Sequence, residues 1–235
     1  MAIVAKFDLE TVQMDAVNAF VHCYIDEVVY IRPPPGFKDG KVLRLRKALY
    51  RLRRSPLLWQ RELTSTFREI GYKEVPQEPC VIISGGVIVF FFVDDIVVCY
   101  RKQDEAKAKA TISGLQAKYT MNILGDLKWF LGIHVLRDRA QKTLWLSQEA
   151  YIEKLANQFQ VDLTDRLPDT PMGTELFPSQ ETATRALIHL FQRKTGSILF
   201  AAISTRLDVV CAASRLARFN TNLSEEYYKA VDWVI

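Results

Sequence analysis

The sequence predicts an α+β fold in which helices back an antiparallel sheet. Residues 87–100 are apolar, β-branched and aromatic, and the charged pair Asp94 and Asp95 interrupts them. Such a run is typical of two buried strands, which most simply form a hairpin with the aspartates at its tip. Residues 55–70 have the spacing of an amphipathic helix and residues 104–119 read as a lysine-rich helix, so strands and helices share one packing unit.

The aspartate pair is the first candidate for chemistry. Two carboxylates about 4 Å apart repel by roughly 4 kcal/mol at an effective dielectric constant of ~20, so an apolar site should either protonate one of them or bind a cation. We favour a cation, although adjacent aspartates are also common in ordinary surface turns. Asp15 is a third candidate, because residues 9–14 read as a strand that ends in this carboxylate before a short helix.

Other elements follow from local signals. Residues 1–7 look like the end of a helix, and residues 27–31 form a short strand that the prolines of residues 33–35 end. Ser55 is expected as the N-cap of the next helix, with Pro56 at its first position. The inner face of this helix should carry Trp59, Leu63, Phe67 and Ile70, and Gly71 should end it.

The second half of the chain is predicted in the same way. Residues 80–84 form a strand that leads through Gly85 and Gly86 into the central hairpin, and residues 129–136 and 143–146 form another hairpin. A helix capped at Ser147 should follow, with an inner face of Tyr151, Ile152, Leu155 and Phe159. Prolines and polar residues from 162 to 180 predict a linker between two packing units, and a last helix begins after Ser224.

The charge distribution indicates a polyanionic partner. The net charge is only +4, but residues 41–61 contain eight Lys or Arg residues and no Asp or Glu. Tyr50 and Trp59 are interleaved with these cations and could stack on bases. The alternative is a solvated helix face.

Several classes of protein are disfavoured by composition. The four cysteines lack C-x-x-C spacing and the three histidines are scattered, so neither a zinc site nor a disulfide framework is indicated. No stretch approaches the ~20 apolar residues of a membrane span, and the N-terminus lacks the layout of a signal peptide. We therefore expect an intracellular protein in a reducing compartment, without a membrane partner.

Four motifs together carry a resemblance to a known family. They are Gln13–Phe20 (QMDAVNAF), Lys47–Leu52 (KALYRL), Phe92–Asp95 (FVDD) and Leu127–Ile133 (LKWFLGI). In this order and approximate spacing the chain resembles the reverse transcriptase of copia-type (Ty/copia) retrotransposons, part of a Pol polyprotein, over almost its whole length.

The resemblance implies a polymerase palm with partial fingers, a thumb and a helical connection segment. We expect partial fingers and palm in residues 1–125, primer grip and thumb in 126–161, a linker in 162–182, and in 183–235 the connection towards a ribonuclease H domain that is itself missing. The family's upstream fingers region, with basic residues that hold the triphosphate, is also expected to be absent.

The resemblance also implies an activity, RNA-directed DNA polymerisation from dNTPs onto a primer 3′-hydroxyl. Two Mg²⁺ ions, or alternatively Mn²⁺, would be held by Asp15, Asp94 and Asp95. Nucleotide-binding residues would be Phe20, Tyr50 and Arg51, with Phe20 excluding a ribose 2′-hydroxyl or else simply filling the core. Contacts to an RNA or DNA template with its primer would come from Arg44, Arg46, Lys47, Arg53, Arg54, Trp129, Phe130, Leu131 and Gly132.

The same resemblance implies partners and a location in the cell. We expect the ribonuclease H and integrase portions of a parent polyprotein as partners. The expected location is the cytoplasm, in a virus-like particle, with the nucleus as the alternative.

Three departures from the family's pattern support a second hypothesis, a degenerate remnant that keeps the fold and binds nucleic acid without turnover. The family usually has glycine where Arg51 stands, glutamine where Arg54 stands and proline where Leu207 stands. Glycine tolerates a positive φ and close approach of a ligand, whereas arginine is sterically disfavoured there.

Overall fold

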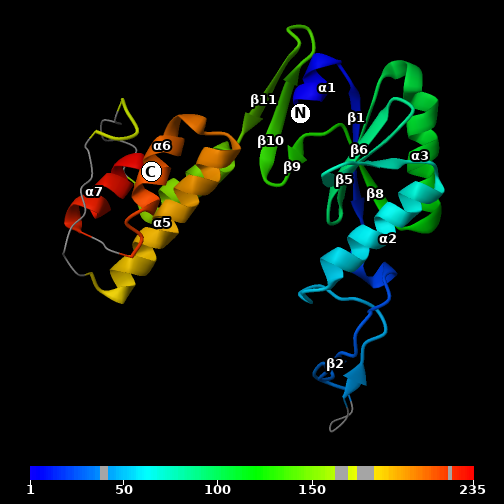
Figure 1. The fold of residues 1–235 in the computed structure, drawn as a ribbon, viewed down its shortest axis with the longest axis horizontal. Coiled ribbons are helices and arrows are strands. Elements are labelled where there is room, and N and C mark those ends of the chain that lie inside the picture. The colour runs from blue at the N-terminus through cyan, green and yellow to red at the C-terminus, as the bar shows by residue number, and fades with distance from the viewer. Residues whose placement is uncertain (38–41, 162–168, 174–182, 222–223) are drawn as a thin grey trace. The chain divides into compact units, whose positions relative to one another are not determined.

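A computed structural model describes the chain except for residues 38–41, 162–168, 174–182 and 222–223. The described chain divides into two compact units. One contains residues 1–130 and 137–144, and the other contains residues 131–136 and 145–235. Figure 1 gives the labels of the helices and strands.

The first unit is built on a six-stranded sheet with the order β4-β5-β6-β7-β1-β8. All neighbouring strands are antiparallel, which confirms the predicted mixed fold of antiparallel sheet and helices. The strands are β4 (Lys73–Val75), β5 (Glu78–Ser84), β6 (Val87–Phe92), β7 (Asp95–Tyr100), β1 (Glu10–Ala16) and β8 (Met121–Gly125). The two-residue turn between β5 and β6 has positive φ at both Gly85 and Gly86, as tight hairpins require.

Two helices pack on this sheet, α2 (Ser55–Glu69) and α3 (Glu105–Lys118). Their apolar side chains join those of β1, β6 and β7 in one buried core. The fully buried members include Met14, Trp59, Leu63, Phe67, Val89, Ile96 and Leu115. The predicted helices at 55–70 and 104–119 are therefore confirmed within one or two residues at each end.

The strand pattern decides where the aspartates lie. Met14 and Ala16 on β1, and Ile96 and Val98 on β7, face the helices as part of the buried core. Because side chains alternate along a strand, Asp15 and Asp95 project from the opposite face of the sheet.

Some local predictions for α2 were wrong. Arg54 takes the N-cap position, without a side-chain cap, because the Ser55 hydroxyl instead donates to the carbonyl of Leu49 at 2.6 Å. Trp59 is fully buried, so it cannot stack on a base. Ile70 lies beyond the end of the helix and is 40% exposed.

Shorter elements complete this part of the chain. They are α1 (Ala2–Lys6), the 3₁₀ turns η1 (Ala19–His22) and η2 (Lys102–Asp104), and the strands β2 (Tyr30–Ile31) and β3 (Leu43–Arg44). The strand expected at 27–31 is confined to its last two residues. The helix expected after Asp15 is a 3₁₀ turn.

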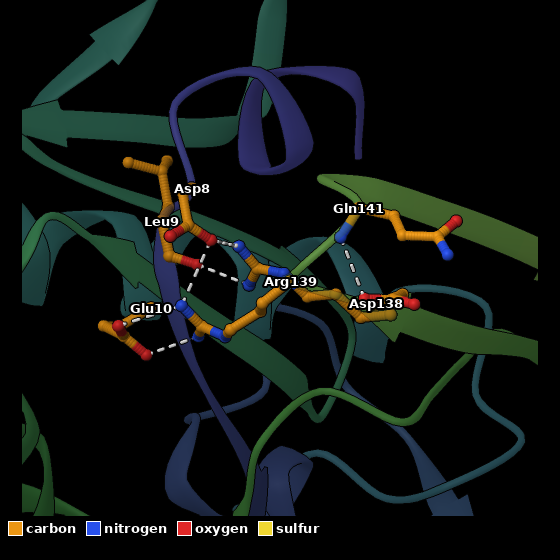
Figure 2. Close-up of polar contacts among 7 residues, drawn as sticks. Asp8, Leu9, Glu10, Asp138, Arg139 and Gln141 are labelled. Carbon is orange, nitrogen blue, oxygen red and sulfur yellow. Dashed lines mark hydrogen bonds and ion pairs between the residues drawn. The ribbon is translucent and has the colours of Figure 1, made fainter.

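A second sheet follows with the order β11-β10-β9. Its strands are β9 (Trp129–Phe130), β10 (Ile133–Asp138) and β11 (Thr143–Ser147). Two arginines near the β10–β11 turn bind the start of β1. Arg137 donates to the carbonyl of Leu9 at 2.6 Å and pairs with Asp8. Figure 2 shows Arg139 between Asp8 and Glu10, with N–O distances of 3.2 and 3.0 Å.

The helical part of the second unit contains α4 (Glu149–Phe159), α5 (Arg185–Ser204), the 3₁₀ turn η3 (Leu207–Val209), α6 (Val210–Ala217) and α7 (Glu225–Val234). Its core includes Phe191, Ala213, Leu216, Tyr227 and Val231. The predicted last helix is confirmed, and Ser224 caps it by accepting from the amide of Tyr227.

The helix expected after Ser147 begins instead at Glu149, after Gln148 at the N-cap. On its inner face Leu155 is buried, and the Tyr151 hydroxyl donates to the carbonyl of Ser197 on α5 at 3.2 Å. Most of the predicted linker lies outside the described residues. Among the helices that the structure describes, none is long and apolar enough to cross a membrane.

Candidate active site

Strand pairing brings Asp15 and Asp95 together. They are direct partners in the β1–β7 register, and residues opposite each other in an antiparallel pair have Cβ atoms about 4.5–5.5 Å apart on one face. Both side chains are half-buried. Two residues that are 80 positions apart in the sequence thus form one edge of the site.

Asp94 lies in the two-residue turn between β6 and β7, because Phe92 pairs directly with Asp95. The carbonyl of Asp94 accepts a hydrogen bond from the amide of Ala16 at 3.0 Å, which fixes the turn against the end of β1. The hydroxyl of Tyr50 donates to Oδ2 of Asp94 at 3.3 Å. The predicted hairpin with the aspartates at its tip is therefore confirmed.

The carboxylates influence one another electrostatically. The pKa of Asp95 is raised above its ordinary value, first by burial, then by the charge of Asp94 and more weakly by Asp15, while a hydrogen bond from Gln13 opposes the shift. The pKa of Tyr50 is raised by burial and then by its charge interaction and hydrogen bond with Asp94. Negative charge is therefore concentrated where a cation would relieve it.

A metal ion would meet oxygen donors here, namely the carboxylates of Asp15 and Asp94, with Asp95 beside them. Within the described residues, no three Asp, Glu, His or Cys side chains are gathered as a ready-made metal cage. This arrangement fits Mg²⁺, which in phosphoryl-transfer sites is commonly held by one or two carboxylates together with substrate phosphates.

The expected nucleotide-binding residues lie beside these carboxylates. Phe20, in η1, is 5% exposed, and its ring lies 4.5 Å from that of Tyr50 between centroids. Tyr50 is 48% exposed. Arg51 follows it with a φ of 72°, which is the left-handed region that glycine adopts without strain.

The cations expected to bind nucleic acid differ in exposure and in their contacts with the rest of the protein. Arg44, Arg46 and Arg53 are exposed. Lys47 donates to the carbonyl of His22 at 3.1 Å and lies 3.7 Å from the centre of the Tyr24 ring. Arg54 is paired with Asp26, which raises the pKa of the arginine. Charge is thus free to meet phosphate chiefly at the exposed arginines.

The Leu127–Ile133 motif forms β9 and a tight turn. The ring of Phe130 packs edge-on against Phe90 of β6, with centroids 5.1 Å apart. Leu131 and Gly132 make the two-residue turn into β10, both at positive φ. Trp129 and Leu131 are 46% and 44% exposed, so apolar side chains are presented at this turn.

Three residues around the carboxylates were missed by sequence reasoning. Gln13 interacts with Asp95, and its place two residues before Asp15 on the same strand face was a usable signal. Asn122 of β8 donates to Asp15 at 3.5 Å. The indole N–H of Trp59 donates to the carbonyl of Val93 at 2.6 Å. Neither of the last two contacts has a signal in the sequence.

Comparisons with known proteins identify the family of the chain. A family model described as "Reverse transcriptase (RNA-dependent DNA polymerase)" matches residues 1–173. The chain is similar to the Retrovirus-related Pol polyprotein from transposon TNT 1-94 of Nicotiana tabacum, with 29% identity over an alignment of 253 residues that covers 100% of this chain and 19% of that protein.

Two further relatives are comparable. The putative transposon Ty5-1 protein of Saccharomyces cerevisiae is 29% identical over 219 residues, covering 88% of this chain and 68% of the relative. The Retrovirus-related Pol polyprotein from transposon RE1 of Arabidopsis thaliana is 29% identical over 236 residues, covering 95% and 15%. The chain thus spans less than a fifth of the length of the two plant Pol polyproteins. It belongs to the reverse transcriptase (RNA-dependent DNA polymerase) family, of the type found in Ty/copia retrotransposon Pol polyproteins.

Proposed function

We propose that the first unit is the palm of an RNA-directed DNA polymerase and that Asp15, Asp94 and Asp95 are its catalytic carboxylates. The observation that carries the proposal is the pairing of Asp15 with Asp95 across β1 and β7, beside a turn that holds Asp94. Family membership supplies the reaction, transfer of a nucleotide from a dNTP to a primer 3′-hydroxyl.

The carboxylates would act through divalent metal. Asp15 and Asp94 would hold two Mg²⁺ ions, or Mn²⁺ as an alternative, with Asp95 as the third carboxylate. When bound, the ions would stabilise charge on the attacking and leaving oxygens. Tyr50 donates to a single oxygen of Asp94, and a carboxyl group has further oxygen lone pairs that can meet a cation.

Replacement of carboxylate by amide tests the metal site. Asp15→Asn and Asp94→Asn should each abolish polymerisation in a primer-extension assay and weaken Mn²⁺ binding in a titration followed by electron paramagnetic resonance. Asp126→Asn, an exposed aspartate just beyond β8, is the matched control and should change neither. Retention of tight Mn²⁺ binding by both site variants would contradict the proposal.

The nucleotide would lie over Phe20, Tyr50 and Arg51. Phe20 is proposed to select deoxynucleotides, because a ring beneath the sugar would clash with a 2′-hydroxyl. The alternative is a core role, which its burial and the tilted contact of its ring with that of Tyr50 favour. Phe20→Ala should relax discrimination against ribonucleotides in primer extension; a folded variant with the parent's selectivity would assign Phe20 to the core.

Template and primer contacts are proposed for two surfaces. The cations Arg44, Arg46, Lys47, Arg53 and Arg54 would hold the template backbone, with the exposed arginines contributing most. Trp129, Phe130, Leu131 and Gly132 would form the primer grip, followed by a thumb and, in residues 183–235, by a connection towards ribonuclease H. By family resemblance, we also propose the ribonuclease H and integrase portions of a parent polyprotein as partners. The proposed location is a virus-like particle in the cytoplasm, with the nucleus as the alternative.

The second candidate function is a remnant that binds nucleic acid without turnover. The observation that favours it is Arg51 at a φ of 72°, because this backbone conformation is strained for a residue with a bulky side chain, and Arg51 directly follows Tyr50, which contacts Asp94. Positioning supplies ~7–11 kcal/mol of a barrier, so a displaced nucleotide would silence intact carboxylates.

Primer extension on RNA and DNA templates separates the two functions. The parent chain and Arg51→Gly would each be fused to the fingers region of a family member. We expect the glycine variant to extend and the parent to extend poorly or not at all. Equal rates would remove the main support for the remnant.

A further inference from the structure

Trp59 makes a contact that its place in the core does not require. It is fully buried on α2, and its indole N–H donates to the carbonyl of Val93 at 2.6 Å. Val93 lies in the β6–β7 turn directly before Asp94. A helix on one face of the sheet therefore reaches the loop that carries the carboxylates.

The turn has a conformation that needs external support. Val93 has a φ of 55°, and a β-branched residue at positive φ is a steric outlier. Such residues persist where the surrounding structure over-determines them. Two carbonyls of this turn are held from outside it, that of Val93 by Trp59 and that of Asp94 by the amide of Ala16 at 3.0 Å.

The position of the indole is fixed independently of the turn. The ring of Tyr119 packs edge-on against Trp59 with centroids 5.1 Å apart. The hydroxyl of Tyr119 in turn contacts that of Thr66 at 2.6 Å and the Glu62 carboxylate at 3.1 Å. Trp59 thus forms part of a packed aromatic and polar cluster made by residues of α2 and by Tyr119 at the end of α3, and the turn is hydrogen-bonded to this cluster through the carbonyl of Val93.

We propose that Trp59 is a positioning residue that holds Val93 in its strained conformation and so keeps Asp94 and Asp95 directed towards Asp15. The effect on metal binding rests on the proposed function, whereas the effect on the turn does not. The competing explanation is that Trp59 only fills the core and that its N–H uses the nearest carbonyl, as buried indoles commonly do.

Amide hydrogen exchange measured by nuclear magnetic resonance tests the turn without metal. The amide of Ala16 reports on the turn, and that of Tyr72, bonded to the carbonyl of Phe67 at 2.9 Å, reports on the end of α2. Trp59→Phe should speed exchange at Ala16 about tenfold and leave Tyr72 within about twofold. Tyr119→Phe removes a hydrogen bond from the same cluster but not from the turn, and should leave Ala16 unchanged.

Three exchange results would overturn the proposal. They are an unchanged rate at Ala16 in Trp59→Phe, equal acceleration at Ala16 and Tyr72, and acceleration of Ala16 by Tyr119→Phe to the same degree. Each would mean that Trp59 stabilises the whole unit or nothing beyond its own packing.

Mn²⁺ titration followed by electron paramagnetic resonance tests the link to the carboxylates. Trp59→Phe should weaken Mn²⁺ binding about tenfold, the lower end of the range for residues that support metal ligands. Glycine adopts positive φ freely, so in a Val93→Gly background the same change should weaken binding by less than about threefold.

Equal losses in both backgrounds, or no loss in either, would overturn the link. A parent that binds no Mn²⁺ at Asp15 and Asp94 would contradict the proposed function instead, and the exchange rates would still decide the role of Trp59 in the turn.

Discussion

At the scale of single residues, two positive φ angles lie beside the carboxylates. Arg51 has a φ of 72° and Val93 a φ of 55°, and neither residue type tolerates this region well. Strain of this kind, roughly 1–3 kcal/mol per residue, accumulates at functional sites. The two positions differ, because Val93 is held by Trp59, whereas the Arg51 side chain is exposed.

Replacement of Arg51 tests the strain at that position. Arg51→Gly should raise the free energy of unfolding by about 1 kcal/mol, because glycine relieves the positive φ and this gain exceeds the added freedom of the unfolded chain. Arg53→Gly, also exposed but without a positive φ, should lower it by roughly 0.5–1 kcal/mol. Urea denaturation measures both. A loss of stability in both variants would show that Arg51 is not strained.

A second residue-scale prediction concerns pH. Because the folded-state pKa of Asp95 is raised, the folded protein binds a proton that the unfolded chain has already lost. Stability should therefore fall as pH rises from the ordinary aspartate value through the raised pKa. Asp95→Asn should remove this fall, so the variant gains on the parent above that window and matches it below the window.

Urea denaturation across pH in a metal-free buffer measures this effect. Glu105→Gln is the control with the opposite sign, because Lys109 lowers the pKa of Glu105 and its contribution is lost as pH falls. A parent and an Asp95→Asn variant with parallel pH curves would contradict the raised pKa.

The positions of the carboxylates could be predicted from the sequence, but the hydrogen bonds that hold them and their turn could not. The strand pattern of residues 9–14 and the apolar run of 87–100 were enough to place Asp15 at the end of a strand and Asp94 and Asp95 at the tip of a hairpin. The supporting contacts come from Asn122 of β8, which donates to Asp15, and from Trp59 of α2, which donates to the carbonyl of Val93. The periodicity of one segment does not specify which atoms of another segment its side chains will contact. Trp59 was therefore predicted both on the inner face of its helix and as a ring that could stack on bases, and its full burial confirms the first prediction and excludes the second.

At the scale of elements, two arginines near the β10–β11 turn bind the start of β1. The Arg137 side chain is 17% exposed and that of Arg139 is 37% exposed. Arg137 also donates to a backbone carbonyl. The contacts of Arg139 drawn in Figure 2 are with the carboxylates of Asp8 and Glu10. The two residues are alike in type and differ in burial.

Alanine substitution should separate them. Arg137→Ala should lower the free energy of unfolding by about 2 kcal/mol, because a partly buried, charge-assisted hydrogen bond to a carbonyl is lost. Arg139→Ala should lower it by less than about 1 kcal/mol, as for exposed ion pairs. Urea denaturation measures both, and equal losses would indicate that the exposed pair stabilises the hairpin as much as the buried one.

Element boundaries were predicted less well than element types. Helix α2, the central hairpin and the last helix were predicted from periodicity and turn residues. The N-cap of α2 was wrong because a serine followed by proline is a good cap, but the Ser55 hydroxyl reaches back to Leu49. The strand expected at 27–31 is short because pairing with β3 begins only at Tyr30.

At the scale of the whole molecule, each unit has its own core. We therefore expect two unfolding transitions, since units with separate cores need not unfold together. Leu63→Ala and Leu216→Ala each remove a fully buried leucine and should each lower stability by about 2–5 kcal/mol. Each should shift one transition in urea and leave the other in place. A single transition shifted equally by both would show that the units unfold as one.

The position of β1 in the sheet also sets an order of folding. The β6–β7 hairpin closes through a two-residue turn, which is a microsecond event. Asp15 joins it only when β1 pairs with β7, and closing so long a loop is slow. On a ribosome, Asp15 is made first and waits until β7 has been made as far as Tyr100, so a chain interrupted between Asp95 and Tyr100 carries all three carboxylates without the complete partner strand for β1.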